Sequence, residues 1–470
     1  MTTNAYADLI SPNLKLVKDR ESLRGFRLDH HTLGRVSPLG YQWVRDCYAH
    51  GTWWASERLA GPQLAPQLRL LKNELWVGPS AGVQTPALGG LNQSLRVARQ
   101  FEAKWQRVSL WNARNINVLV RESPSRDSML VQFDHIRRYM VRIWRLHFLF
   151  QFALRQVHEA ALHDLPDGVQ EEQWIDSLSG WADASTTYVN ECHRITNSLT
   201  YRFRDDDTVR KIVEAFIARR GNRMIRYLDV SEMTLLERPD LFSAIGQSSA
   251  MRQLKSVRRP AYVATHPILD AAWNANYLWW SEEHNADIEW KSLIPLRTSA
   301  QRAADFLEIP SDDIFFFYWP ELIDALRRGS LDAELRERVR RRRHAWKATP
   351  PNDQRGTRTE WTGAGVGGGC GTGPALVCSE EGVDDRAAPG FILVTPGVST
   401  SWLPLLSKAA GCVIVHAGLT SHGVILCRQL GIPCVVGVDR DIVSRSIAGT
   451  MLTVDASHGT VKQLSRTELR

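Results

Sequence analysis

The distribution of tryptophan and glycine changes abruptly near residue 350, and this change constrains the fold more than any other feature of the sequence. Fifteen of the seventeen tryptophans precede Pro350, whereas eighteen of the thirty-two glycines follow it. Large aromatic side chains need a thick apolar core, whereas glycine concentrates in turns and tight loops. The chain has 470 residues, about three times a common domain length of ~150. We therefore expect two differently built regions.

The first region is predicted to be mainly helical, because apolar residues recur there at three- and four-residue spacing. The stretches with this spacing are 91–108, 131–157, 174–201, 209–225, 271–280 and 299–307. Strand-like segments are limited to short pieces such as 74–77 and 116–121. Stripes of aromatic residues, such as Trp144, Phe148 and Phe152, favour helix packing over a ligand cage, although some could line a pocket.

A basic helix over 334–346 is followed by a polar segment rich in proline and glycine, which is typical of a mobile linker. After it, short apolar runs alternate with turns. The predicted organisation is a mainly helical domain over residues 1–349, a linker over 350–362 and a second domain over 363–470. The predicted fold class is therefore multidomain, α followed by α/β.

Composition excludes several classes of protein. With 43% hydrophobic and 23% charged residues, the chain is an ordinary globular protein. The net charge of +7 is modest and its basic residues are interleaved with acidic ones, so nucleic acid is not the expected partner. No targeting peptide is legible, and the two most apolar stretches, 131–157 and 409–427, contain arginines or glycines and histidines, so no membrane association is expected. The seven cysteines form no Cys-x-x-Cys pair, which favours a reduced cytoplasm and predicts no metal site.

The most informative segment of the second region is a short loop that leads into a helix. Residues 417–423 read Ala-Gly-Leu-Thr-Ser-His-Gly, and an apolar helix over Val424–Leu430 is predicted to end at Gly431. An apolar run precedes the loop and another follows Pro433. The pattern predicts strand, tight loop, helix and strand, with His422 at the start of the helix.

This position suits a phosphohistidine. The free N–H groups and the positive end of the helix dipole would stabilise an anionic group on His422. Gly418 and Gly423 would let the phosphate approach the backbone, and Thr420 and Ser421 can either cap the helix or donate hydrogen bonds to phosphoryl oxygens. A neutral imidazole nitrogen is a competent nucleophile. On chemistry alone, the alternative is a purely structural role, because a capped helix with an early histidine is also common as plain structure.

The segment from His416 to Val438 resembles the swivelling phosphohistidine domain of the phosphoenolpyruvate-utilising enzymes, close to the rifampicin phosphotransferase and phosphoenolpyruvate synthase branch. The matching residues are Gly418, Thr420, Ser421, His422, Arg428, Gly431, Pro433, Val435, Val436 and Gly437. Ala417 and Cys427 depart from the pattern, which has glycine and alanine there. The resemblance implies that His422 carries the phosphoryl group and that Gly418, Thr420, Ser421, Gly423 and Arg428 bind phosphate.

The first region resembles, more diffusely, the helical acceptor-binding part of the same branch. Ser37-Pro38-Leu39-Gly40 looks like its start, and the segments 312–322 and 338–346 look like its end. No Walker motif occurs before residue 350, and the single segment 82–90 (GVQTPALGG) is the one candidate there for a glycine-rich phosphate loop, which falls short of an ATP-grasp domain. The resemblance therefore implies that this chain binds no cofactor directly, and that ATP and Mg²⁺ are bound by a separate ATP-grasp protein that charges His422.

Glu283 and His284 are the predicted proton acceptors on the acceptor side, since a carboxylate and a histidine side by side can remove a hydroxyl proton. A solvated surface pair is the alternative for them. The leading functional hypothesis is a cytoplasmic phosphotransferase of secondary metabolism that passes a phosphoryl group from His422 to a small organic hydroxyl or carboxylate. Two alternatives remain: a component that phosphorylates its substrate to activate it for dehydration or reduction, and a non-catalytic binding or regulatory protein with the same fold.

Overall fold

The computed structural model describes most of the chain. The described residues are 11–29, 32, 35–59, 65–71, 73–80, 88–121, 125–178, 191, 195, 206–221, 224, 228–237, 259–277, 285–347, 359–378, 388–398, 402–416, 421–439, 441–445 and 449–464. Within these ranges, no helix combines the length and the apolar character needed to cross a lipid bilayer.

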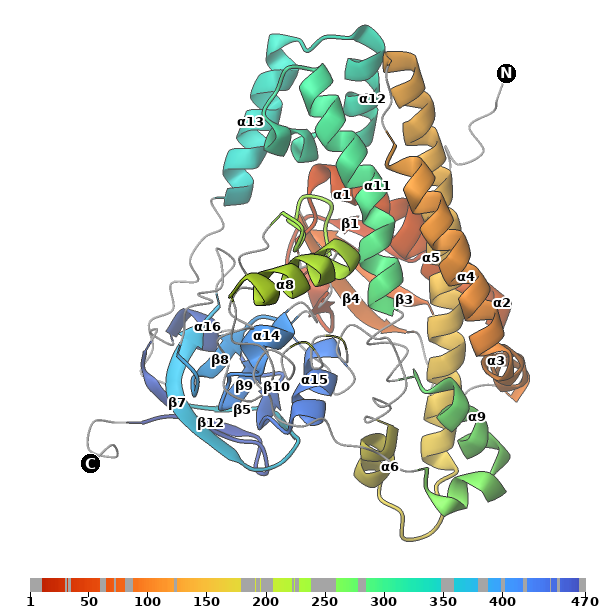
Figure 1. Cartoon of the computed structure of the whole chain (residues 1–470), viewed down its shortest axis with the longest axis vertical. Coiled ribbons are helices and arrows are strands. Elements are labelled where there is room, and N and C mark those ends of the chain that lie inside the picture. Colours follow the sequence, from red (N-terminus) through yellow and green to blue (C-terminus); the bar gives the residue numbers. More distant parts are fainter. Residues whose placement is uncertain are drawn as a thin grey trace.

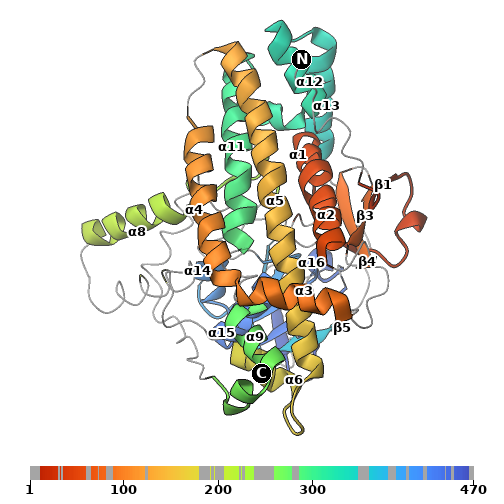
Figure 2. The ribbon, with the colours of Figure 1, turned by 90° about the vertical axis from the view of Figure 1, so that its right-hand side faces the viewer.

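One long helix, α5 (Arg126–His163), organises the first region (Figure 1). It begins with a capping box, in which the side chains of Ser125 and Ser128 each accept a hydrogen bond from the other residue's backbone N–H. The helices that pack along it are α2 (His50–Leu59), α3 (Leu88–Arg99), α4 (Phe101–Leu119), α9 (Pro267–Ala275), α11 (Asn285–Phe306) and α12 (Trp319–Arg328). Figure 2 shows α4, α5 and α11 running side by side.

The aromatic stripes form the core of this region. Trp144 is fully buried, and Phe148 and Phe152 are buried on the same face of α5. Trp144 contacts Trp43 at 5.1 Å between ring centroids and donates a hydrogen bond to the Ser292 hydroxyl on α11. Among the described residues these aromatic stripes therefore pack helices together, as predicted from the sequence.

A small sheet lies beside the helices, and its strands follow in the order β1 (Leu14–Val17), β3 (Pro66–Leu71), β4 (Glu74–Ser80) and β2 (Arg27–Leu28). The predicted strand at 74–77 is confirmed within β4. The predicted strand at 116–121 is wrong, because Ile116 and Leu119 end α4 and are buried. Together with Asn112 they lie at helical spacing, so packing against neighbouring helices overrides the strand propensity of a short β-branched run.

The start of the first region is held by a buried carboxylate. Ser37 caps α1 (Pro38–Trp43) by accepting a hydrogen bond from the Gly40 N–H, and the Ser37 N–H donates to Asp229 at 3.0 Å. Asp229 also accepts from the N–H and the hydroxyl of Ser231. A Cβ on Gly40 would lie 2.0 Å from Oδ2 of Asp229. Glycine is therefore required at position 40 because the carboxylate occupies the space of a side chain.

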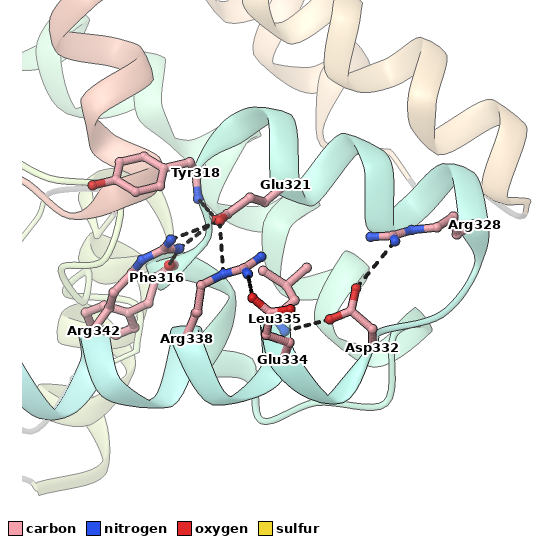
Figure 3. Close-up of polar contacts among 9 residues, drawn as sticks. All are labelled: Phe316, Tyr318, Glu321, Arg328, Asp332, Glu334, Leu335, Arg338 and Arg342. Carbon is pink, nitrogen blue, oxygen red and sulfur yellow. Dashed lines mark hydrogen bonds and ion pairs between the residues drawn. The ribbon is translucent and has the colours of Figure 1, made fainter.

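The end of the first region is held by arginines of α13 (Ala333–Lys347) (Figure 3). Both guanidinium nitrogens of Arg342 donate to Glu321 of α12, at 2.6 and 2.9 Å. The Tyr318 N–H donates to the same carboxylate, and Arg343 pairs with Asp313 at 2.5 Å. The acidic residues of segment 312–322 therefore anchor the basic helix, which explains why the two patterns occur together in the sequence.

The second region contains an eight-stranded sheet. In order across the sheet, its strands are β5 (Glu360–Thr362), β12 (Thr460–Gln463), β11 (Met451–Asp455), β7 (Cys370–Val377), β8 (Ile392–Thr395), β9 (Gly411–Ile414), β10 (Cys434–Val436) and β6 (Ala364–Val366). Strands β7 to β10 are parallel, and the remaining pairs are antiparallel. The shorter helices of this region are α14 (Leu403–Leu406), α15 (His422–Leu430) and α16 (Asp441–Arg445).

The predicted α and α/β parts are thus present in the described residues. The strand β5 occupies the last three residues of the predicted linker, and residues 350–358 lie outside the described part of the chain. The division into domains at 349 and 363 stays a prediction.

Candidate functional site

The predicted loop and helix around His422 follow the carboxyl end of a central parallel strand. β9 ends at Ile414, and α15 begins at His422 after Ser421, whose backbone is extended. The helix ends at Gly431 in the left-handed conformation, with φ of 62°, as the sequence predicts. Ligands of parallel α/β sheets bind at the carboxyl ends of the strands. The start of α15 therefore lies at the edge of the sheet where such sites form.

Several of the predicted site residues lie outside the part of the chain that the structure describes. Gly418 and Thr420 belong to residues 417–420, which are not described, and the backbone but not the side chain of His422 is described. Their predicted roles stay predictions. What the structure does describe is the helix on which His422 stands and the surroundings of Ser421, Gly423 and Arg428.

Ser421 presents a hydroxyl that does not cap the helix. Its backbone carbonyl accepts from the N–H groups of Val424 and Ile425, each at 3.0 Å. Its Oγ is buried, yet within the described residues it has no hydrogen-bond partner. A buried hydroxyl without a partner costs stability. The Ser421 hydroxyl is thus one donor at the start of α15 that a bound phosphoryl oxygen would satisfy.

Gly423 is constrained by packing. A Cβ at this position would lie 2.6 Å from Cβ of Val398 and 3.1 Å from Cδ1 of Ile414. The first turn of α15 therefore lies closer to β9 and to the segment after β8 than any larger residue would permit. This contact fixes where the helix begins, and with it the position of the His422 backbone.

Arg428 lies at the other end of α15 from His422, about 9 Å along the helix axis at 1.5 Å per residue. It is buried, with 8% of its surface exposed. Burial lowers the pKa of its guanidinium, and the carboxylates of Asp176, Glu172 and Glu171 oppose this shift. All three carboxylates belong to α6 (Glu171–Leu178). The structure therefore associates Arg428 with an acidic helix of the first region, and its predicted role in phosphate binding stays a prediction.

Ile425 lies one turn before Arg428 on the same face of α15. It is buried within the hydrophobic cluster of the first region, whereas Val424 and Cys427 pack within the cluster of the second. One face of α15 thus packs on its own sheet, and the adjacent face contacts the helical region. The helix that begins at His422 is itself part of the contact between the two regions.

A second contact comes from α8 (Asp206–Arg220), which Figure 1 shows above the C-terminal sheet. Phe216 and Ile217 of α8, together with Leu235, belong to the same buried cluster as Trp402 and Leu403 beside α14. The two regions therefore share apolar as well as charged contacts. Neither contact was predicted, because residues of α6 and α8 are separated from α15 by more than 200 positions in the sequence.

The predicted proton acceptors Glu283 and His284 lie outside the described residues. Before them, α9 ends at Ala275 and is followed by Asn276, a non-glycine residue with φ of 22°. The Asn276 side chain donates a hydrogen bond to the Leu178 carbonyl at the end of α6. Tyr277 then contacts His158 of α5, with 5.7 Å between ring centroids. Burial and the charge of Arg155 lower the pKa of His158 to about 4, so this imidazole is neutral at pH 7.

The second region is similar in sequence to proteins of known class. Residues 387–459 match the family described as PEP-utilising enzyme, mobile domain. A phosphoenolpyruvate synthase from Pyrococcus furiosus is 36% identical over 99 residues, which cover 21% of this chain and 12% of that protein. A pyruvate kinase from Lactobacillus delbrueckii subsp. bulgaricus is 40% identical over 102 residues, covering 22% of this chain and 17% of that protein.

A rifampicin phosphotransferase from a Streptomyces species aligns further, at 28% identity over 309 residues, covering 54% of this chain and 35% of that protein. Since fewer than a third of the residues follow position 349, this similarity extends into the helical region. A solved UPF0107 protein covers 23% of this chain, with 18% identity and a TM-score of 0.19, which is too low to support an argument.

Residues 387–459, which include α15, thus resemble the mobile domain of the PEP-utilising enzymes. In this part the chain is similar to the phosphoenolpyruvate synthases, and over a longer stretch it is similar to a rifampicin phosphotransferase. It spans between 12% and 35% of the length of these relatives.

Proposed function

We propose that this chain is a phosphotransferase component that carries a phosphoryl group on His422 and passes it to a small organic acceptor. The observation that carries the proposal is the position of His422. It is the first residue of α15, beyond the carboxyl end of β9, within the segment that matches the mobile domain. The names of the relatives, a phosphoenolpyruvate synthase and a rifampicin phosphotransferase, support phosphoryl transfer.

Two displacements at phosphorus make up the reaction. An imidazole nitrogen of His422 attacks the phosphoryl donor, a P–N bond forms, and the P–O bond to the leaving group breaks. An acceptor oxygen then attacks the same phosphorus, the P–N bond breaks, and the acceptor proton passes to a base. The N–H groups of the first helical turn and the Ser421 hydroxyl would stabilise the phosphoryl oxygens in both steps.

The phosphoryl donor is proposed to be a separate ATP-grasp protein that binds ATP and Mg²⁺. This proposal rests on the sequence before residue 350, which contains no Walker motif and no glycine-rich ATP-grasp segment. In this proposal His422 must reach two places: the partner protein and the acceptor.

The acceptor is proposed to bind to the helical region, with Glu283 and His284 as the groups that take its proton. The contact of α15 with α6 supports this location. Ile425 and Arg428 face the helical region from the same helix that begins at His422. In this arrangement the phosphocarrier helix lies against the region that resembles the acceptor-binding part.

The test uses the full chain, a purified ATP-grasp protein of the kind proposed as its partner, and ATP labelled with ³²P in its β and γ phosphates. Acid-labile, base-stable label on the chain is expected only when both proteins and ATP are present. His422→Ala should abolish the label, whereas His458→Ala, an exposed histidine of the same region, should leave it unchanged. Equal labelling of His422→Ala and the unmodified chain would contradict the proposal.

A further inference from the structure

Three cysteines meet beneath the helix that begins at His422. Cys412 is on β9, Cys434 is on β10 and Cys427 is on α15. The three sulfur atoms all lie within 4.8 Å of one another, and all three residues are fully buried. In the sequence they are separated by 15 and 7 positions, so no spacing rule for metal ligands would find them.

The topology of the sheet brings these sulfurs together. Cys412 and Cys434 are direct partners in the parallel register of β9 and β10, so their side chains emerge on the same face of the sheet. α15 covers that face, and Cys427 points from the helix into the same buried cluster. Two adjacent strands and one helix therefore each contribute one sulfur to a single cluster.

Packing alone is the simpler explanation for a buried cysteine, since a thiol behaves as a small hydrophobe. It explains Cys47 and Cys378, which are buried away from this group. It does not explain why three thiols converge, or why Cys427 replaces the alanine of the family pattern.

We propose that Cys412, Cys427 and Cys434 form a binding site for one soft, thiophilic metal ion, Cu(I), coordinated by three sulfurs. Three sulfurs around a metal at ~2.3 Å lie about 4 Å apart, which the observed separations of up to 4.8 Å approach closely. Zinc takes four ligands in structural sites, and within the described residues this group contains three. Soft thiolates also select Cu(I) over hard cations such as Mg²⁺ or Ca²⁺.

The charge balance of the site is also favourable. Each thiol that binds as a thiolate releases its proton to solvent when the metal–sulfur bond forms. The resulting buried negative charge needs a counter-charge. The buried guanidinium of Arg428 follows Cys427 directly on α15. Arg428 would thus offset the charge of the metal–thiolate group.

The site is separate from the proposed phosphocarrier end of α15. Cys427 is five residues after His422, about 7.5 Å along the helix axis. A metal here would tie α15 to β9 and β10 without touching the start of the helix. The proposal therefore does not depend on the proposed function, and either can fail without the other.

The test titrates the reduced full chain with Cu(I) under anaerobic conditions, in competition with a chromogenic Cu(I) chelator. One tightly bound Cu(I) per chain is expected. Cys427→Ala, which restores the family residue, should weaken binding at least ~100-fold, as loss of one of three ligands from a buried site removes most of the coordination energy. Cys378→Ala and Cys47→Ala, which remove buried cysteines outside the group, should bind as the unmodified chain does.

X-ray absorption on the Cu(I)-loaded unmodified chain gives a second measurement that does not depend on any variant folding. Three sulfurs at about 2.3 Å are expected around the copper. Failure of the unmodified chain to retain Cu(I), equal binding by Cys427→Ala, or a copper environment with fewer than three sulfurs would each overturn the proposal.

Discussion

Substituting Gly40 by alanine should destabilise the protein, although the same change in an exposed helix stabilises. The helix propensity of alanine favours it over glycine by about 1 kcal/mol. In this protein the new Cβ would lie 2.0 Å from Oδ2 of Asp229 and 3.0 Å from Oγ of Ser37. The carboxylate must move, and it accepts hydrogen bonds from the Ser37 N–H at 3.0 Å and from the Ser231 N–H and hydroxyl at 2.9 and 2.7 Å.

Each hydrogen bond to a charged group contributes about 1.5–3 kcal/mol. If the displaced carboxylate loses one or two of these bonds, the cost is about 2–5 kcal/mol, which exceeds the gain in helix propensity. We therefore expect Gly40→Ala to lower the free energy of unfolding by about 1–4 kcal/mol. Urea unfolding followed by tryptophan fluorescence measures this region, because fifteen of the seventeen tryptophans precede residue 350.

A double-mutant cycle provides the control. Asp229→Ala alone should also destabilise, since it leaves the Ser37 N–H without its acceptor. In the double variant the Cβ of residue 40 meets no carboxylate, so Gly40→Ala should then be neutral or stabilising. Additive effects of the two substitutions would refute the steric explanation of Gly40, as would a more stable single variant.

Three further outcomes are expected. Glu321→Gln should lower the free energy of unfolding at pH 7 by about 1–2 kcal/mol. Burial raises the pKa of Glu321, but the hydrogen bonds from Arg342 outweigh burial and hold the pKa below its usual value. The urea midpoints of the two proteins should therefore converge as pH falls through that lowered pKa, and a difference independent of pH would contradict this. Arg428→Glu should raise hydrogen exchange in α6 and α15 at least tenfold, because it replaces a buried cation that interacts favourably with the carboxylates of α6 by an anion that they repel. Glu172→Arg should partly restore protection, and unchanged exchange would contradict the interaction. His284→Ala should slow acceptor phosphorylation by about 100- to 10,000-fold, because the general base is lost, while labelling of the carrier histidine persists. Transfer at the normal rate would show that His284 is not the base.

The parts of the fold that follow from local sequence were predictable. The start of α15 at His422 and its end at Gly431 follow from loop chemistry and helix-stop signals within fifteen residues. The strand over 74–77 was visible for the same reason. The segment 116–121 was misassigned because its β-branched residues indicate a strand locally, whereas burial of Ile116 and Leu119 against other helices stabilises α4.

Features that depend on distant residues were not predictable from the sequence. Gly40 was noted as part of a family-like motif, but its steric reason is Asp229, which lies 189 positions later. Arg428 was assigned to phosphate binding from the resemblance, and its electrostatic interaction with the carboxylates of α6 gave no signal in the sequence. The three-cysteine group required the register of β9 and β10 and the covering helix. In each case the partner is supplied by tertiary packing, for which one sequence without an alignment gives no signal.

The central claim, that His422 carries the phosphoryl group, is tested most directly by locating the phosphate on the charged protein. The full chain is incubated with the ATP-grasp protein and ATP, and the linkage is examined by ³¹P NMR and by mass spectrometry of peptides prepared at alkaline pH. The account predicts one phosphoryl group per chain, bonded to an imidazole nitrogen of His422 and lost in acid. A phosphoryl group bonded to oxygen, or to a different histidine, would contradict it.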